Sequence, residues 1–124
     1  MPSALAAALP RLLAQAPFVP LGTSGGGVRC VGRGPARLVV LPGLVGTADA
    51  LAGLGEALAD THHTALVTWP RVDGLDALLA WLETVRGHLG GGPLAVYGGS
   101  FGGLVAQAWL RHTPAQFDEL VVSG

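Results

Sequence analysis

The sequence predicts an α/β fold built on a mostly parallel sheet. From residue 38 onward, short apolar runs alternate with longer segments in which apolar residues recur every three or four positions. The runs are typical of strands buried on both faces, and the periodic segments are typical of amphipathic helices. This alternation predicts parallel strands joined by right-handed crossovers, with helices on both faces of the sheet.

Two further elements are expected before this alternation begins. Residues 1–16 are rich in Ala and Leu and predict a short N-terminal amphipathic helix that docks on the domain. The first residues carry no Lys or Arg, which argues against a secretory signal. Residues 18–21 and 28–31 are apolar and flank the glycine-rich stretch 22–27, a pattern that predicts a hairpin.

Each expected parallel strand is a largely apolar run followed by a turn or helix signal. The expected strands cover residues 38–41, 65–68, 94–97 and 119–122. The last of them would form an uncovered edge of the sheet, so we expect aggregation, pairing with another chain, or that the sequence is an excerpt from a longer protein. The sequence shows neither an internal repeat nor a linker, so residues 1–124 are expected to form a single, partial domain.

Helices are expected between the strands. Thr47 can cap a helix over residues 48–60, and Asp73 can cap a longer helix that extends to about Leu89. A third helix is expected over residues 101–112. The apolar stripe expected on the middle helix consists of Leu75, Leu78, Leu79, Leu82 and Val85.

The composition excludes several classes of protein. Half of the residues are apolar and only 12% are charged, which excludes disorder. The formal net charge of −1 provides no electrostatic basis for binding nucleic acid or an anionic membrane, and no run of about 18 apolar residues could span a membrane. We expect no cofactor and no metal. The single cysteine, Cys30, is expected to be a small buried residue; it cannot form an internal disulfide, which favours a cytoplasmic location.

The chemistry is indicated by residues 98–102, Gly-Gly-Ser-Phe-Gly, which match the G-x-S-x-G pattern of a nucleophile elbow. In such an elbow the serine lies on a tight strand-to-helix turn, so that its hydroxyl projects above the sheet. Gly98 and Gly102 would let the strand and the helix approach without a clash of Cβ atoms. Ser100 is therefore the candidate nucleophile.

The pattern occurs a second time at residues 22–26, where Ser24 takes the place of the nucleophile. A segment that contains Pro20 precedes this match, and more glycines and a strand-like stretch follow it. Because no helical pattern follows, Ser24 is assigned to the hairpin turn. Ser100, in contrast, lies between an apolar strand and a helical segment.

A second loop is expected to complete the site. In a hydrolase, the loop after the first long parallel strand supplies one backbone N–H of the oxyanion hole, and the residue after the nucleophile supplies the other. Here the loop begins at Pro42-Gly43, so the two donors would be the backbone N–H groups of Leu44 and Phe101.

Together, residues 42–49, 69–70 and 98–107 resemble the first half of an α/β-hydrolase, over about residues 18–124. The Pro-Gly loop with the following Gly-Thr-Ala-Asp, and the Ala-Gln pair after the Ser-x-Gly-Gly, resemble more narrowly the maspardin-like branch. A proline stands where many hydrolases have the histidine of a His-Gly loop. The resemblance implies an incomplete α/β-hydrolase fold that acts on a small acyl substrate: an ester, a thioester or an amide.

By family order, the acid and the histidine of the triad follow later strands, and the chain ends before both. The four histidines present are expected at the edge of the sheet opposite Ser100, or at the far ends of the helices; they are His62, His63, His88 and His112. The isolated chain is therefore expected to lack a general base. Two alternatives to a hydrolase remain open: a non-catalytic interaction protein on the same fold, as the maspardin-like features imply, and a truncated remnant without function.

Overall fold

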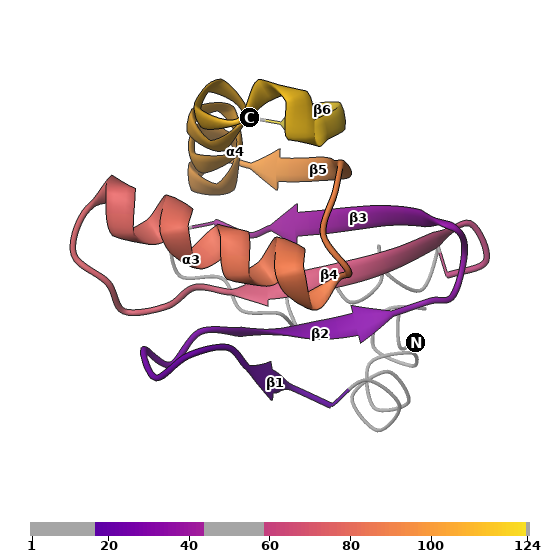
Figure 1. Cartoon of the computed structure of the whole chain (residues 1–124), viewed down its shortest axis with the longest axis horizontal. Coiled ribbons are helices and arrows are strands. Elements are labelled where there is room, and N and C mark those ends of the chain that lie inside the picture. Colours follow the sequence, from indigo (N-terminus) through magenta and orange to yellow (C-terminus); the bar gives the residue numbers. More distant parts are fainter. Residues whose placement is uncertain (1–16, 44–58, 124) are drawn as a thin grey trace, which may run out of the picture.

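The computed structural model describes residues 17–43 and 59–123 (Figure 1). The helix expected over residues 1–16 lies outside the described residues. So does nearly all of the helix expected over 48–60, and residues 59–61, where it was expected to end, form a turn.

The strands form one six-stranded sheet in the order β1-β2-β4-β3-β5-β6. In chain order they are β1 (Val19–Pro20), β2 (Gly27–Val31), β3 (Ala36–Leu41), β4 (His62–Thr68), β5 (Leu94–Gly99) and β6 (Phe117–Ser123). β1 and β2 are the expected hairpin, and β2 pairs antiparallel with β4. The other neighbours are parallel, which confirms the predicted fold class.

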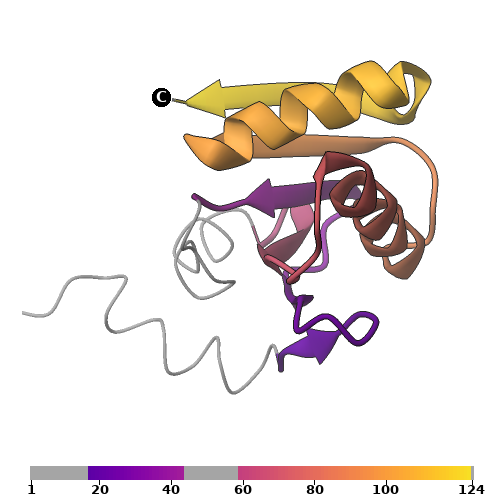
Figure 2. The ribbon, with the colours of Figure 1, turned by 90° about the vertical axis from the view of Figure 1, so that its left-hand side faces the viewer.

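The described α-helices are α3 (Leu75–His88) and α4 (Phe101–His112), and the short 3₁₀ helix η2 (Pro114–Gln116) precedes β6. The connections from β4 to β5 and from β5 to β6 advance in the same direction across the sheet. Two right-handed crossovers in the same direction place their helices on one face. Accordingly, α3 and α4 pack together. Figure 2 shows α4 running back along β6, so that its first turn lies at the edge to which the strand points.

The start of α3 differs from the expectation. Asp73 was expected to cap this helix, but the N-cap position is Gly74, and no side chain caps it by a hydrogen bond. The backbone at Gly74 has a φ of 87°, a conformation that favours glycine over residues with a side chain. The chain therefore enters α3 through a glycine turn. Asp76 remains in the first turn, where the helix dipole favours a negative charge.

The apolar stripe of α3 is confirmed except at its first position. Leu75 is 50% exposed, whereas the other expected members are buried. The stripe also contains Trp81, which lies between Leu78 and Val85 on the buried side of the helix. Its indole N–H donates a hydrogen bond of 2.9 Å to the carbonyl of Leu21 and so ties α3 to the end of β1.

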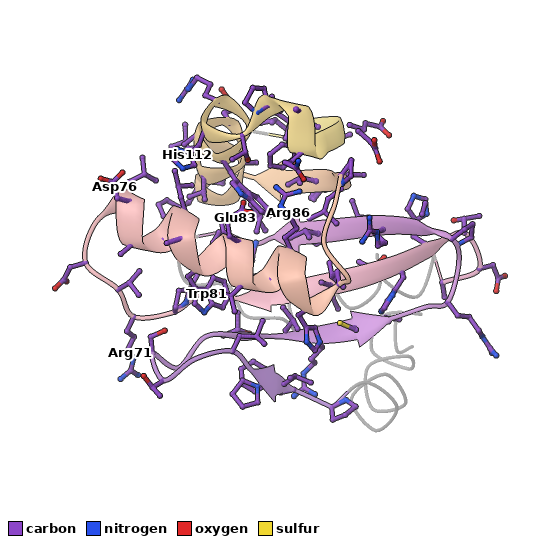
Figure 3. The ribbon with its side chains drawn as sticks, viewed as in Figure 1. Arg71, Asp76, Trp81, Glu83, Arg86 and His112 are labelled. Atoms are coloured by element: carbon purple, nitrogen blue, oxygen red, sulfur yellow. The ribbon has the colours of Figure 1, made fainter. Side chains whose placement is uncertain are left out.

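A buried cation joins α3, α4 and η2. Arg86 is 5% exposed, and Figure 3 shows it with Glu83 beside α4. Its guanidinium donates to the Glu83 carboxylate at 3.1 Å and to the carbonyls of Gly92 and Gln116 at 2.8 and 2.7 Å. It also lies 4.9 Å from the ring centroid of Trp109, a fully buried side chain of α4. Because the charge is hydrogen-bonded on several sides, its burial is compensated, and it fixes α4 against the sheet.

The strand β6 forms one outer edge of the described sheet. Val121 and Val122 are 45% and 43% exposed on this strand. An edge strand with apolar side chains is a surface on which a further strand can pair. The pairing of another chain with β6 stays a prediction.

Candidate active site

Ser100 lies at the junction between β5 and α4 and is exposed. β5 is an interior parallel strand of the sheet, with β3 on one side and the edge strand β6 on the other. α4 begins at the next residue, Phe101, and Ser100 is its N-cap residue. The serine is therefore at the carboxyl edge of the strands, on a turn without intervening loop residues, as the sequence predicted.

The backbone of Ser100 is held in a sparsely populated conformation. Its φ is 54° and its ψ is −120°. Among residues 17–43 and 59–123, it is the one non-glycine residue with a positive φ. Its N–H donates to the carbonyl of Ser123 in β6 at 2.9 Å, and its carbonyl accepts from the N–H of Gly103 at 3.0 Å. Conformations of this kind cost about 1–3 kcal/mol and cluster at functional sites. The bonds to β6 and α4 maintain the turn against that cost.

The glycines on each side of Ser100 allow the strand and the helix to meet. A Cβ atom at Gly98 would lie 2.4 Å from the carbonyl oxygen of Gly102. A Cβ atom at Gly102 would lie 2.1 Å from the carbonyl oxygen of Leu41 and 2.7 Å from that of Pro42. No side chain fits at such distances, so both positions require glycine. The same contacts bring the end of β3 against the first turn of α4.

The first turn of α4 provides an environment that favours negative charge. Helix N–H groups in the first turn have no partner within the helix, and the macrodipole is positive at that end. Phe101, predicted as an oxyanion donor, is the first residue of α4, and no acidic side chain lies in this turn. The other predicted donor, the N–H of Leu44, lies outside the described residues.

Sequence reasoning missed the contribution of Trp69, which follows β4. Its indole N–H lies 3.2 Å from the carbonyl oxygen of Pro42 and 2.9 Å from that of Gly43, and donates to both. Its ring meets the ring of Phe101 edge-on, with centroids 5.5 Å apart and planes at 79°. The sequence signal is a tryptophan directly after a strand, and it predicted only the end of that strand and part of the family resemblance.

An apolar groove of about 550 Å³ opens next to this turn. One wall is the exposed face of α4 from Phe101 to Arg111, and the other is formed by the start of α3 and the segment before it. Leu104, 67% exposed, and Leu75 contribute apolar surface to it. The groove could hold an apolar group of a substrate whose reacting bond lies at Ser100.

None of the four histidines of the sequence lies near Ser100. His62 and His63 are the first residues of β4. Across the sheet, His63 is level with Leu94 of β5, and Leu94 lies six residues before Ser100. At about 3.3 Å per residue, this row is about 20 Å away. His112 ends α4, about 16 Å along the helix from its first residue. His88 ends α3, which also runs back toward the amino edge of the strands.

Two other residues that could act as nucleophiles are placed elsewhere. Ser24 lies in the loop of the hairpin between β1 and β2, as predicted, and no helix follows it. Cys30 is half-buried in β2, and burial raises the pKa of its thiol. A raised pKa reduces the thiolate fraction at neutral pH and so reduces reactivity. Ser100 is thus the candidate nucleophile that combines exposure with a helix N-terminus.

The described residues show no features of a metal site or of a membrane-spanning helix. Within residues 17–43 and 59–123, no three His, Cys, Asp or Glu side chains are close enough to hold a metal ion. No helix in the same ranges has the length and apolar character needed to cross a bilayer.

Neither a family model nor a curated protein matches the sequence. Solved structures do match. A candidate lipase from Acinetobacter baumannii AYE aligns over 100% of this chain and 48% of its own, with a TM-score of 0.80 and 18% identity. Carboxylesterase CesB from Bacillus subtilis aligns over 95% of this chain and 47% of its own (TM-score 0.74, 18% identity). An epoxide hydrolase variant from Vigna radiata aligns over 86% of this chain and 37% of its own (TM-score 0.74, 12% identity).

These identities are low, so the similarity concerns the fold. The chain spans about half or less of the length of the solved structures it matches. Over that span, the TM-scores of 0.74 to 0.80 show that the backbones share one fold. The chain has the α/β-hydrolase fold.

Proposed function

We propose that the protein is a serine hydrolase that acts on an ester, a thioester or an amide, with Ser100 as the nucleophile. The observation that carries the proposal is the turn at Ser100: an exposed serine between an interior parallel strand and a helix, with a φ of 54°. This geometry supports the assignment of a nucleophile elbow. The glycine contacts at Gly98 and Gly102 support it, since they are the contacts that such an elbow requires.

In the proposed reaction, the Ser100 oxygen attacks the substrate carbonyl carbon and its proton passes to a histidine base. The N–H groups of Phe101 and Leu44 stabilise the negative charge on the carbonyl oxygen. The leaving group departs with the proton, and the acyl group remains on Ser100. Water then attacks this acyl-enzyme and releases the carboxylic acid. We place the histidine and the acid of the triad in residues that follow this chain in the full-length protein.

The substrate class follows from the groove beside the turn. Its walls are mainly apolar, and it begins at Phe101, the residue after the nucleophile. We therefore propose an apolar acyl group in the substrate. We propose a cytoplasmic location as well, since the single cysteine fits a reducing compartment.

Replacement of Ser100 tests this proposal. In the full-length protein, Ser100→Ala is expected to reduce the kcat for p-nitrophenyl butyrate by about three orders of magnitude or more, because the reaction loses its nucleophile. Ser24→Ala is the matched control, since it changes the serine of the second G-x-S-x-G match in the hairpin, and its kcat should equal that of the unmodified protein. Equal turnover by the unmodified protein and Ser100→Ala would refute the assignment.

The second candidate is a maspardin-like interaction protein that uses the hydrolase fold without catalysis. The observation that favours it is the Pro42-Gly43 sequence, where many hydrolases have a His-Gly loop. If this candidate is correct, the full-length protein has no triad histidine and Ser100→Ala leaves partner binding unchanged. The kinetic comparison above separates the two candidates.

A further inference from the structure

We infer that Arg111 determines the substrate specificity of the site: it binds a carboxylate at the far end of the acyl chain, while the groove along α4 holds the methylene groups. The inference rests on the proposed hydrolase function and names its substrate class. The substrates would be monoesters, monothioesters or monoamides of long dicarboxylic acids. The distant carboxylate takes no part in the acyl transfer itself.

The groove follows one face of α4 from the turn at Ser100 to the end of the helix. Phe101, Leu104, Ala108 and Arg111 line it. These residues are three or four positions apart, so they lie on the same side of a helix with about 3.6 residues per turn. One end of the groove is therefore at the residue after the nucleophile, and the other end is at Arg111.

The middle of the groove presents apolar surface from both walls. Leu104 of α4 is 67% exposed, and Leu75 of α3 is 50% exposed. On α3 and α4 they are the large apolar side chains that the structure leaves exposed, and both line the groove. Concave apolar surface of this kind is typical of ligand-binding sites. Methylene groups of an acyl chain would cover it.

Arg111 gives the far end of the groove a positive charge. Among the lining residues, all of which belong to the described part of the chain, it is the one charged side chain. It is exposed, and no carboxylate of the described residues pairs with it. Arg37 and Arg86, in contrast, donate to backbone carbonyls and connect elements of the fold. A free guanidinium can bind a carboxylate through two parallel hydrogen bonds.

The length of α4 determines which acyl chains reach Arg111. Arg111 follows Phe101 by ten positions, so the two residues lie about 15 Å apart along the helix axis. Helix side chains incline toward the N-terminus, which shortens the distance that the ligand must span. A carboxylate on a short acyl chain would end near Ser100. A carboxylate on a long chain would extend along the groove to the guanidinium.

Two pairs of esters test the inference in the full-length protein. The long pair is p-nitrophenyl hydrogen sebacate and p-nitrophenyl decanoate, which have acyl chains of equal length and differ in the terminal carboxylate. The short pair is p-nitrophenyl hydrogen adipate and p-nitrophenyl hexanoate. For each pair, the measured quantity is the ratio of kcat/KM for the carboxylate ester to kcat/KM for the plain ester.

The unmodified protein is expected to prefer the sebacate ester in the long pair. Arg111→Gln should lower that ratio by about 10-fold, because a charged hydrogen bond at an exposed position is lost. It should change the ratio of the short pair by less than about 2-fold, since that carboxylate does not reach Arg111. Loss of folded protein lowers both esters of a pair equally, so it cannot produce this result.

Arg33→Gln is the matched control. Arg33 is also exposed, but it lies in the turn between β2 and β3, at the edge of the sheet opposite Ser100. The substitution removes the same charge from the protein. Both ratios should stay within about 2-fold of those of the unmodified protein, because solvent and salt screen a distant surface charge.

The possible outcomes are distinct. An unchanged long-pair ratio in Arg111→Gln, or an equal change in both pairs, would overturn the inference and leave the proposed function intact. An unchanged ratio is also the result expected if a different part of the full-length protein fills the groove. Absence of Ser100-dependent turnover of all four esters would overturn the proposed function, and the role of Arg111 with it.

Discussion

Replacing Gly102 with alanine is expected to lower the free energy of unfolding of the full-length protein by about 3 kcal/mol. The added methyl group would lie 2.1 Å from the carbonyl oxygen of Leu41, a backbone atom in the middle of the sheet. Either α4 or the end of β3 must move to accommodate it. Because Ser100 lies two residues before Gly102, such a movement also displaces the nucleophile, so kcat should fall with stability.

Gly87→Ala is the control for this change. Gly87 lies in α3, is exposed, and a Cβ atom there would meet nothing within 4 Å. Alanine is favoured over glycine in a helix by about 0.5–1 kcal/mol, so this variant should be slightly more stable than the unmodified protein. Urea unfolding of both variants provides the measurement. Equal or greater stability of Gly102→Ala would contradict the close approach between β3 and α4.

The isolated 124-residue chain is expected to hydrolyse p-nitrophenyl acetate at a rate near background. It contains no lysine, and its four histidines lie at the far edge of the strands or at the far ends of α3 and α4. A serine hydroxyl without a base within hydrogen-bond distance is a weak nucleophile. Loss of a triad member costs several orders of magnitude, although an oxyanion hole alone retains some catalysis.

The measurement compares the rates of the chain, its Ser100→Ala variant and buffer. The expected result is a small excess over buffer at most, similar in both proteins. Robust turnover that Ser100→Ala abolishes would show that a base exists within this chain. In that case the assignment of the triad histidine to later residues would be wrong.

Much of the fold could be predicted because its signals are local. An apolar run such as residues 94–97 followed by Gly-Gly-Ser-Phe-Gly specifies a strand and a sharp turn within a dozen residues. The boundaries were less accurate: β4 begins at His62 and β6 at Phe117, earlier than the expected apolar runs. In β4 the pairing continues into the polar residues His62 and His63, because backbone hydrogen bonds do not depend on apolar side chains.

The features that were missed depend on contacts between distant residues. Trp69 bonds to carbonyls 26 and 27 residues away in the chain, and Arg86 to a carbonyl 30 residues away. No local pattern distinguishes a tryptophan at a strand end from one that restrains a loop. Likewise, periodicity placed Leu75 on the buried face of α3, but Leu75 is the first residue of the helix and lines the open groove.

The central claim is that the turn at residue 100 holds a reactive hydroxyl above the carboxyl edge of the sheet. Treatment of the full-length protein with a fluorophosphonate, followed by peptide mass spectrometry, tests it directly. The account predicts a phosphonate adduct on Ser100, with none on Ser24 and none after Ser100→Ala. An unlabelled protein, or an adduct on a different residue, would contradict it.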